Sequence, residues 1–196
     1  MTTTTNDDQN ITTYHAICAV VLRELRVQRR MYPAQFADFL CKLPSAWQNI
    51  ESGNARLDFD TLLRVSRGLG VQPSAILQVA DGYEFFLRSF QWSVVVNDLE
   101  GKDGLMKLAK DYWKSPGCRD DERRTYGTPI LNVPFQNPGW QNVVNVFGYA
   151  VDPQFRAQQH DEERFKPLPS ILDQAAQNGV NGGGGVNGVN GDPHGI

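Results

Sequence analysis

The chain has 196 residues, 40% of them hydrophobic, and a formal net charge of −3. This length allows one or two modest cores, and the slight excess of acidic residues argues against a nonspecific nucleic-acid coat protein. The charge is uneven, because residues 14–81 carry a net +2, residues 1–13 carry −2 and residues 82–196 carry −3. If any part of the chain contacts a polyanion, residues 14–81 are the favoured segment.

The sequence has no pattern for a structural metal site or a disulfide scaffold. Cys18, Cys41 and Cys118 are odd in number and lack C-x-x-C spacing, and the three histidines are far apart. The opening MTTTTNDDQNITT lacks the basic and apolar regions of a signal peptide, and no apolar run approaches the ~20 residues needed to span a bilayer. We therefore expect a reduced, cytoplasmic protein without metal or cofactor.

Catalytic motifs are also missing from the sequence. It contains no P-loop, G-x-S-x-G, H-E-x-x-H or strand-linked G-x-G-x-x-G pattern. Cys118 and His160 could supply a nucleophile and a base, but nothing in the sequence orients them. The run Asp161–Glu163 is typical of a solvated charged surface. We expect that the protein is not an enzyme.

In chain order, residues 1–12 are rich in Thr, Asn, Asp and Gln, and we expect them to be disordered. Residues 13–81 follow with apolar residues three and four positions apart, a spacing that predicts five short helices. The apolar positions of these helices are Ile17, Cys18, Val21, Leu22 and Leu25; Phe36, Ala37 and Leu40; Trp47 and Ile50; Leu62, Leu63, Val65 and Leu69; and Ile76 and Leu77.

Turn and cap residues separate these predicted helices. Gly53 is expected to end the third helix in a left-handed conformation, and Asp58 to cap the start of the fourth. Gly70 follows the fourth helix, and Pro73 suits the first position of the fifth. The sequence thus predicts a compact helical domain over residues 13–81.

From residue 82 to about 172 the pattern changes, and we predict a small α+β module. Phe90–Val96 is β-branched and aromatic, which indicates a strand, whereas 103–114 has helical spacing. The segment from Pro116 to Arg124 is expected to be a loop, Thr128–Phe135 an edge strand, and Asn142–Val151 either strand or helix. Residues 173–196 are Gly/Asn-rich, and we expect a flexible tail.

Five motifs lie without a gap between residues 22 and 74. They are L-R-x-L-R at 22–26, F-A-x-x-L at 36–40, W-x-x-I-E-x-G at 47–53, T-L-L-R-V at 61–65 and L-G-V-x-P-S at 69–74. In these motifs the chain resembles the XRE family of phage Cro/repressor-like helix-turn-helix domains. The resemblance covers about 60 of 196 residues. It implies an N-terminal, all-α, five-helix, lambda-repressor-like fold over residues 14–81.

The resemblance also implies a DNA-binding surface on the third helix. Base contacts would come from Pro44, against a thymine methyl group, and from Ser45, Gln48 and Asn49, whose polar groups can bond base edges. The alternative is that these are ordinary solvated residues, whereas Trp47 is expected to be a core anchor. The implied phosphate contacts are Arg29, Arg30, Gln35, Lys42, Asn54 and Arg56, and the arginine cluster Arg23, Arg26, Arg29 and Arg30 lies beside them.

The chain departs from the family pattern at several positions. Tyr32 and Pro33 stand where relatives have a Ser/Thr cap and a phosphate-binding Gln. Cys41 occupies a turn position usually held by left-handed Gly, and Leu43 replaces a Ser/Thr cap, each at a cost of about 1 kcal/mol. These changes leave open a domain that binds DNA weakly or has been recruited to bind protein.

The resulting hypothesis is a sequence-specific transcriptional regulator, a repressor that binds double-stranded DNA as a homodimer at the nucleoid. The alternatives are an interaction adaptor that has lost DNA readout, and an antitoxin-type regulator. Residues 82–172 could provide dimerisation or a protein partner's site. Their aromatic residues Phe85, Phe86, Phe90 and Trp92 either supply that surface or fill the module's own core.

Overall fold

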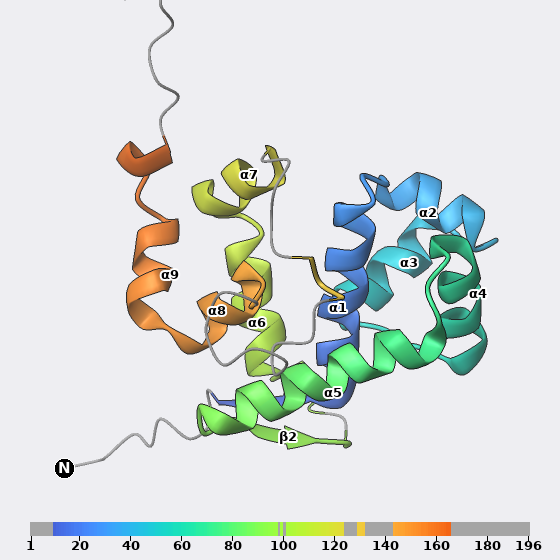
Figure 1. Cartoon of the computed structure of the whole chain (residues 1–196), viewed down its shortest axis with the longest axis horizontal. Coiled ribbons are helices and arrows are strands. Elements are labelled where there is room, and N and C mark those ends of the chain that lie inside the picture. Colours follow the sequence, from blue (N-terminus) through green and yellow to red (C-terminus); the bar gives the residue numbers. More distant parts are fainter. Residues whose placement is uncertain (1–9, 98, 100, 124–128, 132–142, 166–196) are drawn as a thin grey trace, which may run out of the picture. The chain divides into compact units, whose positions relative to one another are not determined.

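The computed structural model describes residues 10–97, 99, 101–123, 129–131 and 143–165, with the side chains of 120–123 excluded (Figure 1). Within these ranges the chain is mostly helical and has one small parallel sheet of two strands. None of the helices in these ranges combines the length and the apolar character that a membrane crossing requires. The predicted tail, 173–196, lies outside the described residues.

Helix α1 (Tyr14–Gln28) is the centre of the fold. Thr13 caps it by accepting the Ala16 N–H at 3.0 Å, and the residues from Ala16 to Leu22 are all buried. A helix buried on nearly every side must be covered by several partners, and α1 contacts α3, α5 and α6. In Figure 1 it lies between the α2–α4 group and α6.

Two short helices follow α1, as predicted. Helix α2 (Pro33–Phe39) and helix α3 (Pro44–Glu51) each begin at a proline, and Cys41 in the turn between them has the predicted left-handed conformation, with φ 53°. The indole of Trp47 is buried and meets the Phe36 ring edge-on, with the ring centroids 4.7 Å apart. The prediction that Trp47 is a core anchor is therefore confirmed.

Helix α4 (Phe59–Leu69) and helix α5 (Pro73–Ser89) complete the predicted set of five. Gly53 and Gly70 are left-handed, with φ of 70° and 64°, as their predicted turn positions require. Helix α5 continues eight residues past Asp81, so the expected domain boundary falls inside it. The reason is that buried residues at 79, 83, 86 and 87 continue the helical spacing, and no proline interrupts them.

The cap of α4 gives a testable pH dependence. The Asp58 carboxylate accepts the Thr61 N–H and hydroxyl at 2.6 and 2.8 Å, and these bonds, with weaker help from Lys42, lower the pKa of Asp58. Because the folded pKa is lowered, the stabilisation exists above the ordinary pKa of about 3.9 and disappears as pH falls through the folded value. Asp58→Ala should cost about 1 kcal/mol of unfolding free energy at pH 7 and much less at pH 3, measured by urea denaturation.

Asp60→Ala is the matched control for that experiment. Asp60 lies in the same first turn but only pairs with Arg64 on the exposed face, at 2.8 Å. Its loss should cost no more than about 0.5 kcal/mol. Equal losses for the two variants at pH 7, or a loss for Asp58→Ala that does not change with pH, would contradict the capping role.

The sheet joins two distant segments. Strand β1 (Ile11–Thr13) pairs in parallel with strand β2 (Ser93–Val95), in the register Ile11↔Ser93 and Thr13↔Val95. The predicted strand over 90–96 is confirmed in its central residues. Ile11 and Thr12 were expected in a disordered segment, and that expectation is wrong for them because β2 supplies their backbone partners.

The remaining helices differ in part from the predictions. Helix α6 (Gly104–Tyr112) confirms the predicted helix over 103–114, and α8 (Asn145–Val151) resolves the open choice at 142–151 as helix. Helix α7 (Pro116–Arg123) replaces the predicted loop, because Ser115 accepts the Cys118 N–H and Pro116 suits a first helical position. Helix α9 (Pro153–Gln159) and a 3₁₀ turn (Glu163–Phe165) follow. Within the predicted edge strand, Pro129–Leu131 is not a strand. The other residues of that segment lie outside the described residues.

Residues before and after position 82 share one core. The Tyr83 ring of α5 stacks on the Phe147 ring of α8, with centroids 3.7 Å apart, and the Tyr83 hydroxyl accepts the Val144 N–H. The described residues up to Phe165 cluster as one compact unit. The expected separate α+β module does not form in the described residues, because β2 finds its strand partner ahead of α1.

Candidate nucleic-acid interface

Helix α3 has a buried side and an exposed side. Trp47, Ile50 and Glu51 are buried against the other helices. Pro44, Ser45, Gln48 and Asn49 are all exposed, and their positions follow helical spacing along the opposite side. The four predicted base-contact residues therefore lie together on one accessible face, with amide and hydroxyl groups directed away from the core.

The loop after α3 is fastened to this helix. The Asn49 carbonyl oxygen accepts the backbone N–H of Asn54 at 2.8 Å and the Ser52 hydroxyl at 3.2 Å. Asn54 and Arg56 are exposed in this loop. Two of the predicted phosphate-contact residues are thus held close to the C-terminal end of the exposed α3 face.

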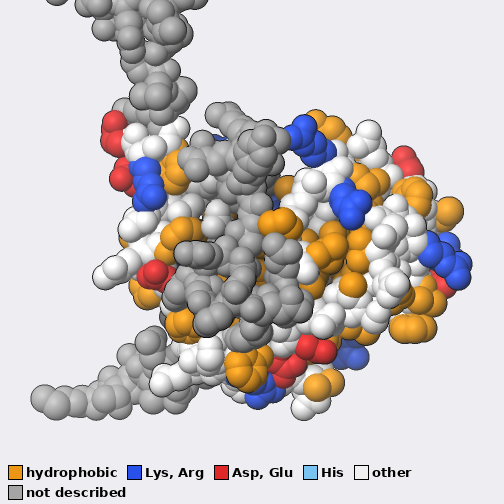
Figure 2. Space-filling view, in the orientation of Figure 1, with side chains coloured by type: hydrophobic (Ala, Val, Ile, Leu, Met, Phe, Trp, Pro, Cys, Tyr) orange, Lys and Arg blue, Asp and Glu red, His pale blue; other side chains and the backbone are white. Residues whose placement is uncertain are grey.

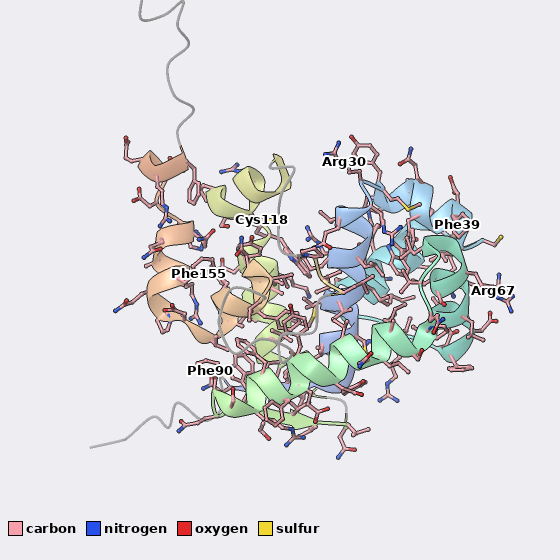
Figure 3. The ribbon with its side chains drawn as sticks, viewed as in Figure 1. Arg30, Phe39, Arg67, Phe90, Cys118 and Phe155 are labelled. Atoms are coloured by element: carbon pink, nitrogen blue, oxygen red, sulfur yellow. The ribbon has the colours of Figure 1, made fainter. Side chains whose placement is uncertain are left out.

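Arg29 and Arg30 follow the end of α1. Both side chains are exposed, and neither makes a hydrogen bond or an ion pair within the part of the chain that the structure describes. Arg30 has a left-handed backbone, with φ 55°, which ends the helix and turns the chain toward α2. Figure 3 places Arg30 at this turn, beside α2. These two guanidinium groups are available to an anion.

The other two members of the arginine cluster have structural partners. Arg26 is buried, and its Nε and Nη2 donate to the Glu51 carboxylate at 2.6 and 3.1 Å, while Nη1 donates to the Met31 carbonyl at 2.5 Å. Arg23 lies over the Trp113 ring, 4.1 Å from its centroid. Arg26 is therefore not available for phosphate contact, because burial commits it to Glu51.

Gln35 and Lys42 also have intramolecular partners. The Gln35 side-chain oxygen accepts the Tyr32 N–H at 3.2 Å and so helps to cap α2. Lys42 is half-buried, with its Nζ 3.7 Å from the Asp58 carboxylate. Either side chain would have to give up an existing contact before it could bind a phosphate.

The surface around α2, α3 and α4 has mixed character. Figure 2 shows basic side chains spaced over this end of the molecule, with acidic and hydrophobic side chains between them. Tyr32 and Leu43, which take the places of capping residues, are each 72% exposed. This part of the molecule therefore combines separate positive charges with exposed apolar groups.

The structure gives His160 different neighbours from those weighed in the sequence. Its Nε2 lies 2.7 Å from the Tyr149 hydroxyl and 3.4 Å from the Asp111 carboxylate, and Tyr149 also donates to Asp111. Burial and the bond to Asp111 raise the pKa of Tyr149, which favours the protonated phenol. Cys118 is buried, so its thiol is not placed for attack on a substrate.

The charged run after His160 makes a hydrogen bond with a neighbouring backbone group. The exposed Asp161 carboxylate accepts the Glu163 N–H at 3.1 Å and thereby starts the 3₁₀ turn. Among the described residues, no three His, Cys, Asp or Glu side chains are grouped so that they could hold a metal ion. Sequence reasoning missed the Asp111–Tyr149–His160 contact, since the three residues are joined only by the packing of α6, α8 and α9.

Comparison of the chain with protein-family models, curated proteins and solved structures gives no match. The assignment of a function therefore depends on the residues and geometry described above.

Proposed function

We propose that the protein is a sequence-specific, double-stranded-DNA-binding regulator whose recognition helix is α3. The observation that carries this proposal is the exposed polar side of α3, where Ser45, Gln48 and Asn49 are accessible while Trp47 and Ile50 fix the helix to the core. Glutamine and asparagine amides can each donate to and accept from adenine N7 and N6 in the major groove. In helix-turn-helix proteins, a short recognition helix packed on a helical core places such side chains against base edges in the major groove.

In this proposal α1–α5 are a lambda-repressor-like domain and α2 and α3 its helix-turn-helix pair. The order of the helices and the short left-handed turn at Cys41 agree with that expectation. The buried Arg26–Glu51 pair supports it as well, because it joins the L-R-x-L-R motif at 22–26 to the W-x-x-I-E-x-G motif at 47–53. In this proposal the ion pair holds the recognition helix α3 to α1.

The phosphate contacts of the proposed interface fall into two groups. Arg29 and Arg30 carry exposed guanidinium groups after the end of α1. Arg56 and Asn54 are exposed in the loop after α3, and Arg56 also has an interaction within the chain. Gln35 and Lys42 are the weaker candidates because they are engaged within the chain. Each phosphate neutralised by an arginine releases counterions, so these contacts make the affinity dependent on salt.

The regulator would act as a homodimer that represses by occupying a promoter. One α3 reads only a few base pairs, and two copies on half-sites about 34–36 Å apart would give useful affinity. Of the four aromatic residues considered for pairing, Phe86 and Trp92 are buried in the chain's own core, whereas Phe85 is 61% exposed on α5. We therefore propose Phe85 as the aromatic contact of such a dimer, in a cytoplasmic, nucleoid-associated protein.

Base readout by α3 can be tested with DNA selected from a random pool by the full-length protein. Gln48→Ala and Asn49→Ala should each weaken binding to the selected sequence about 5- to 150-fold, corresponding to ~1–3 kcal/mol for a bidentate contact. Binding to unrelated DNA should hardly change. Fluorescence anisotropy at two salt concentrations measures both affinities.

The matched control is Gln154→Ala, an exposed glutamine on α9 far from α3 in the sequence. It should leave both affinities unchanged. Arg29→Ala should instead weaken all DNA equally and reduce the salt slope by about one unit. Selection that enriches no sequence, or α3 variants that bind as the parent does, would defeat the proposal.

An interaction adaptor is the second candidate function. The exposed Tyr32 and Leu43, with Phe39 and Phe59 on the neighbouring helices, favour it, because such apolar groups suit a protein surface better than a phosphate backbone. Figure 3 shows Phe39 at the outer end of α2, beside α4. Capture of partners that persists after nuclease treatment favours the adaptor, and its loss favours DNA. An antitoxin role would need a toxin gene next to this one.

A further inference from the structure

A cavity of about 1110 Å³ lies away from α3, between the loop that precedes α6, the helix α6 itself and the start of α9. The end of α5 and strand β1 close its other side. Its size is slightly above the usual range of about 300–1,000 Å³ for small-molecule sites, and it is far larger than a single inorganic anion requires. None of the residues proposed to contact DNA lines it.

Four cationic side chains line this cavity, namely Lys102, Lys107, Lys110 and Arg156. The amino groups of the three lysines make no ion pair or hydrogen bond that involves a described residue. Arg156 is held in place, because its Nε and Nη2 donate to the Tyr149 and Ala150 carbonyl oxygens at 3.2 and 3.0 Å. The cations therefore converge on the cavity without a carboxylate partner among its described lining residues.

Asp103 is the acidic residue among the described lining residues, and its carboxylate is already occupied. It accepts hydrogen bonds from the Thr12 hydroxyl, the Thr13 N–H and hydroxyl, and the Met106 N–H, at 2.8 to 3.1 Å. These donors belong to β1 and α6 and not to the lysines. Unneutralised lysines around a partly enclosed space raise its positive potential, which attracts an anion.

The other part of the lining is apolar. Phe90 and Trp92 come from the end of α5 and the segment after it, Leu108 from α6, and Val151 and Pro153 from the junction of α8 and α9. Figure 3 shows Phe90 at the end of α5 on this side of the molecule. Burial of apolar ligand surface against these residues would add to the binding free energy. The lining therefore favours a ligand that has an apolar part as well as a charged group.

We propose that this cavity binds a small molecule that joins an acidic group to an apolar body, such as an aromatic or medium-chain carboxylate. The acidic group would meet Lys107 and Lys110, which lie on one side of α6, while the apolar body would lie against Trp92 and Leu108. Ligand binding in this cavity does not depend on DNA binding by α3. The ligand proposal can therefore hold even if the proposed function is wrong.

The test uses 8-anilino-1-naphthalenesulfonate, an aromatic anion whose fluorescence rises on apolar burial, titrated into the folded full-length chain. We expect saturable binding that decanoate displaces. Lys107→Glu with Lys110→Glu should weaken it at least tenfold, whereas Lys114→Glu, which follows α6 and does not line the cavity, should change it less than twofold. The milder pair Lys107→Gln with Lys110→Gln should weaken binding severalfold, and circular dichroism must show each variant folded.

A neutral analogue separates charge from apolar contact. N-phenyl-1-naphthylamine has a similar ring system without the sulfonate, and its weaker binding should change less than threefold in the glutamate pair. Decanoate should also raise the Tm of the parent protein more than that of the variant. Absence of saturable binding, equal weakening by Lys114→Glu, or displacement by inorganic phosphate as effective as by decanoate would overturn the proposal.

Discussion

Arg26→Ala is expected to lower the free energy of unfolding by about 3–5 kcal/mol, the largest loss from one side chain predicted here. The variant would leave the Glu51 carboxylate buried without its cationic partner, and removing one member of a buried pair carries this cost. The Met31 carbonyl would lose its donor as well. Urea denaturation followed by circular dichroism measures the loss.

A double variant separates the charge from the space that the pair fills. Arg26→Met with Glu51→Leu replaces both charges by apolar side chains of similar size, and it should recover most of the stability lost in Arg26→Ala. Arg23→Ala is the control on the same helix, because its guanidinium lies over Trp113 at the half-buried surface and should cost only about 1 kcal/mol. A loss below about 1 kcal/mol for Arg26→Ala would show that the pair does not hold α3 to α1.

The same pair links stability to the proposed function. Glu51 belongs to α3 and is buried, whereas Gln48 and Asn49 of the same helix are exposed, so the ion pair positions the recognition surface without facing the DNA. The apolar double variant should therefore bind the selected DNA as the parent does. Arg26→Ala should lose DNA binding only to the extent that it unfolds, which measurements at low temperature can separate.

Local signals explain why the first five helices could be predicted. Asp58, Gly70 and Pro73 start or end helices through contacts within one turn of their own positions. Their effect can therefore be predicted without knowledge of the rest of the chain. The exposed side of α3 was predictable for the same reason, since the spacing of Trp47 and Ile50 fixes which side is buried. The left-handed Cys41 needed the family resemblance, because its residue type gives no such signal.

Long-range partners explain what the sequence did not reveal. Arg26 belongs to a cluster of four arginines in the sequence, and only its position four residues after the apolar Leu22 indicates that it lies on a buried side of α1. Helix α5 passes the expected boundary at 81 because Tyr83 packs on Phe147, which lies 64 residues further along the chain. Gln35 was assigned to phosphate, yet it bonds to the Tyr32 N–H three residues earlier. The lysine-lined cavity depends on segments brought together by the whole fold.

Asp103→Ala is expected to have the second largest effect, a loss of about 2–4 kcal/mol. The Asp103 carboxylate caps α6 through the Met106 N–H and also holds strand β1 through Thr12 and Thr13. A lost cap alone costs about 0.5–2 kcal/mol, and a buried hydroxyl left without its partner, here that of Thr12, adds about 1–3 kcal/mol.

Because Thr13 in turn caps α1, the Asp103 variant should loosen the starts of two helices together. Hydrogen exchange should therefore rise at the Ala16 and Met106 amides in the same variant. Asp152→Ala is the matched control, since Asp152 caps only α9, through the Gln154 and Phe155 N–H groups, and should cost about 1 kcal/mol with no change at α1. Equal losses for the two variants, or exchange that rises at α6 alone, would mean that Asp103 is an ordinary cap and that β1 is held to the core by its pairing with β2.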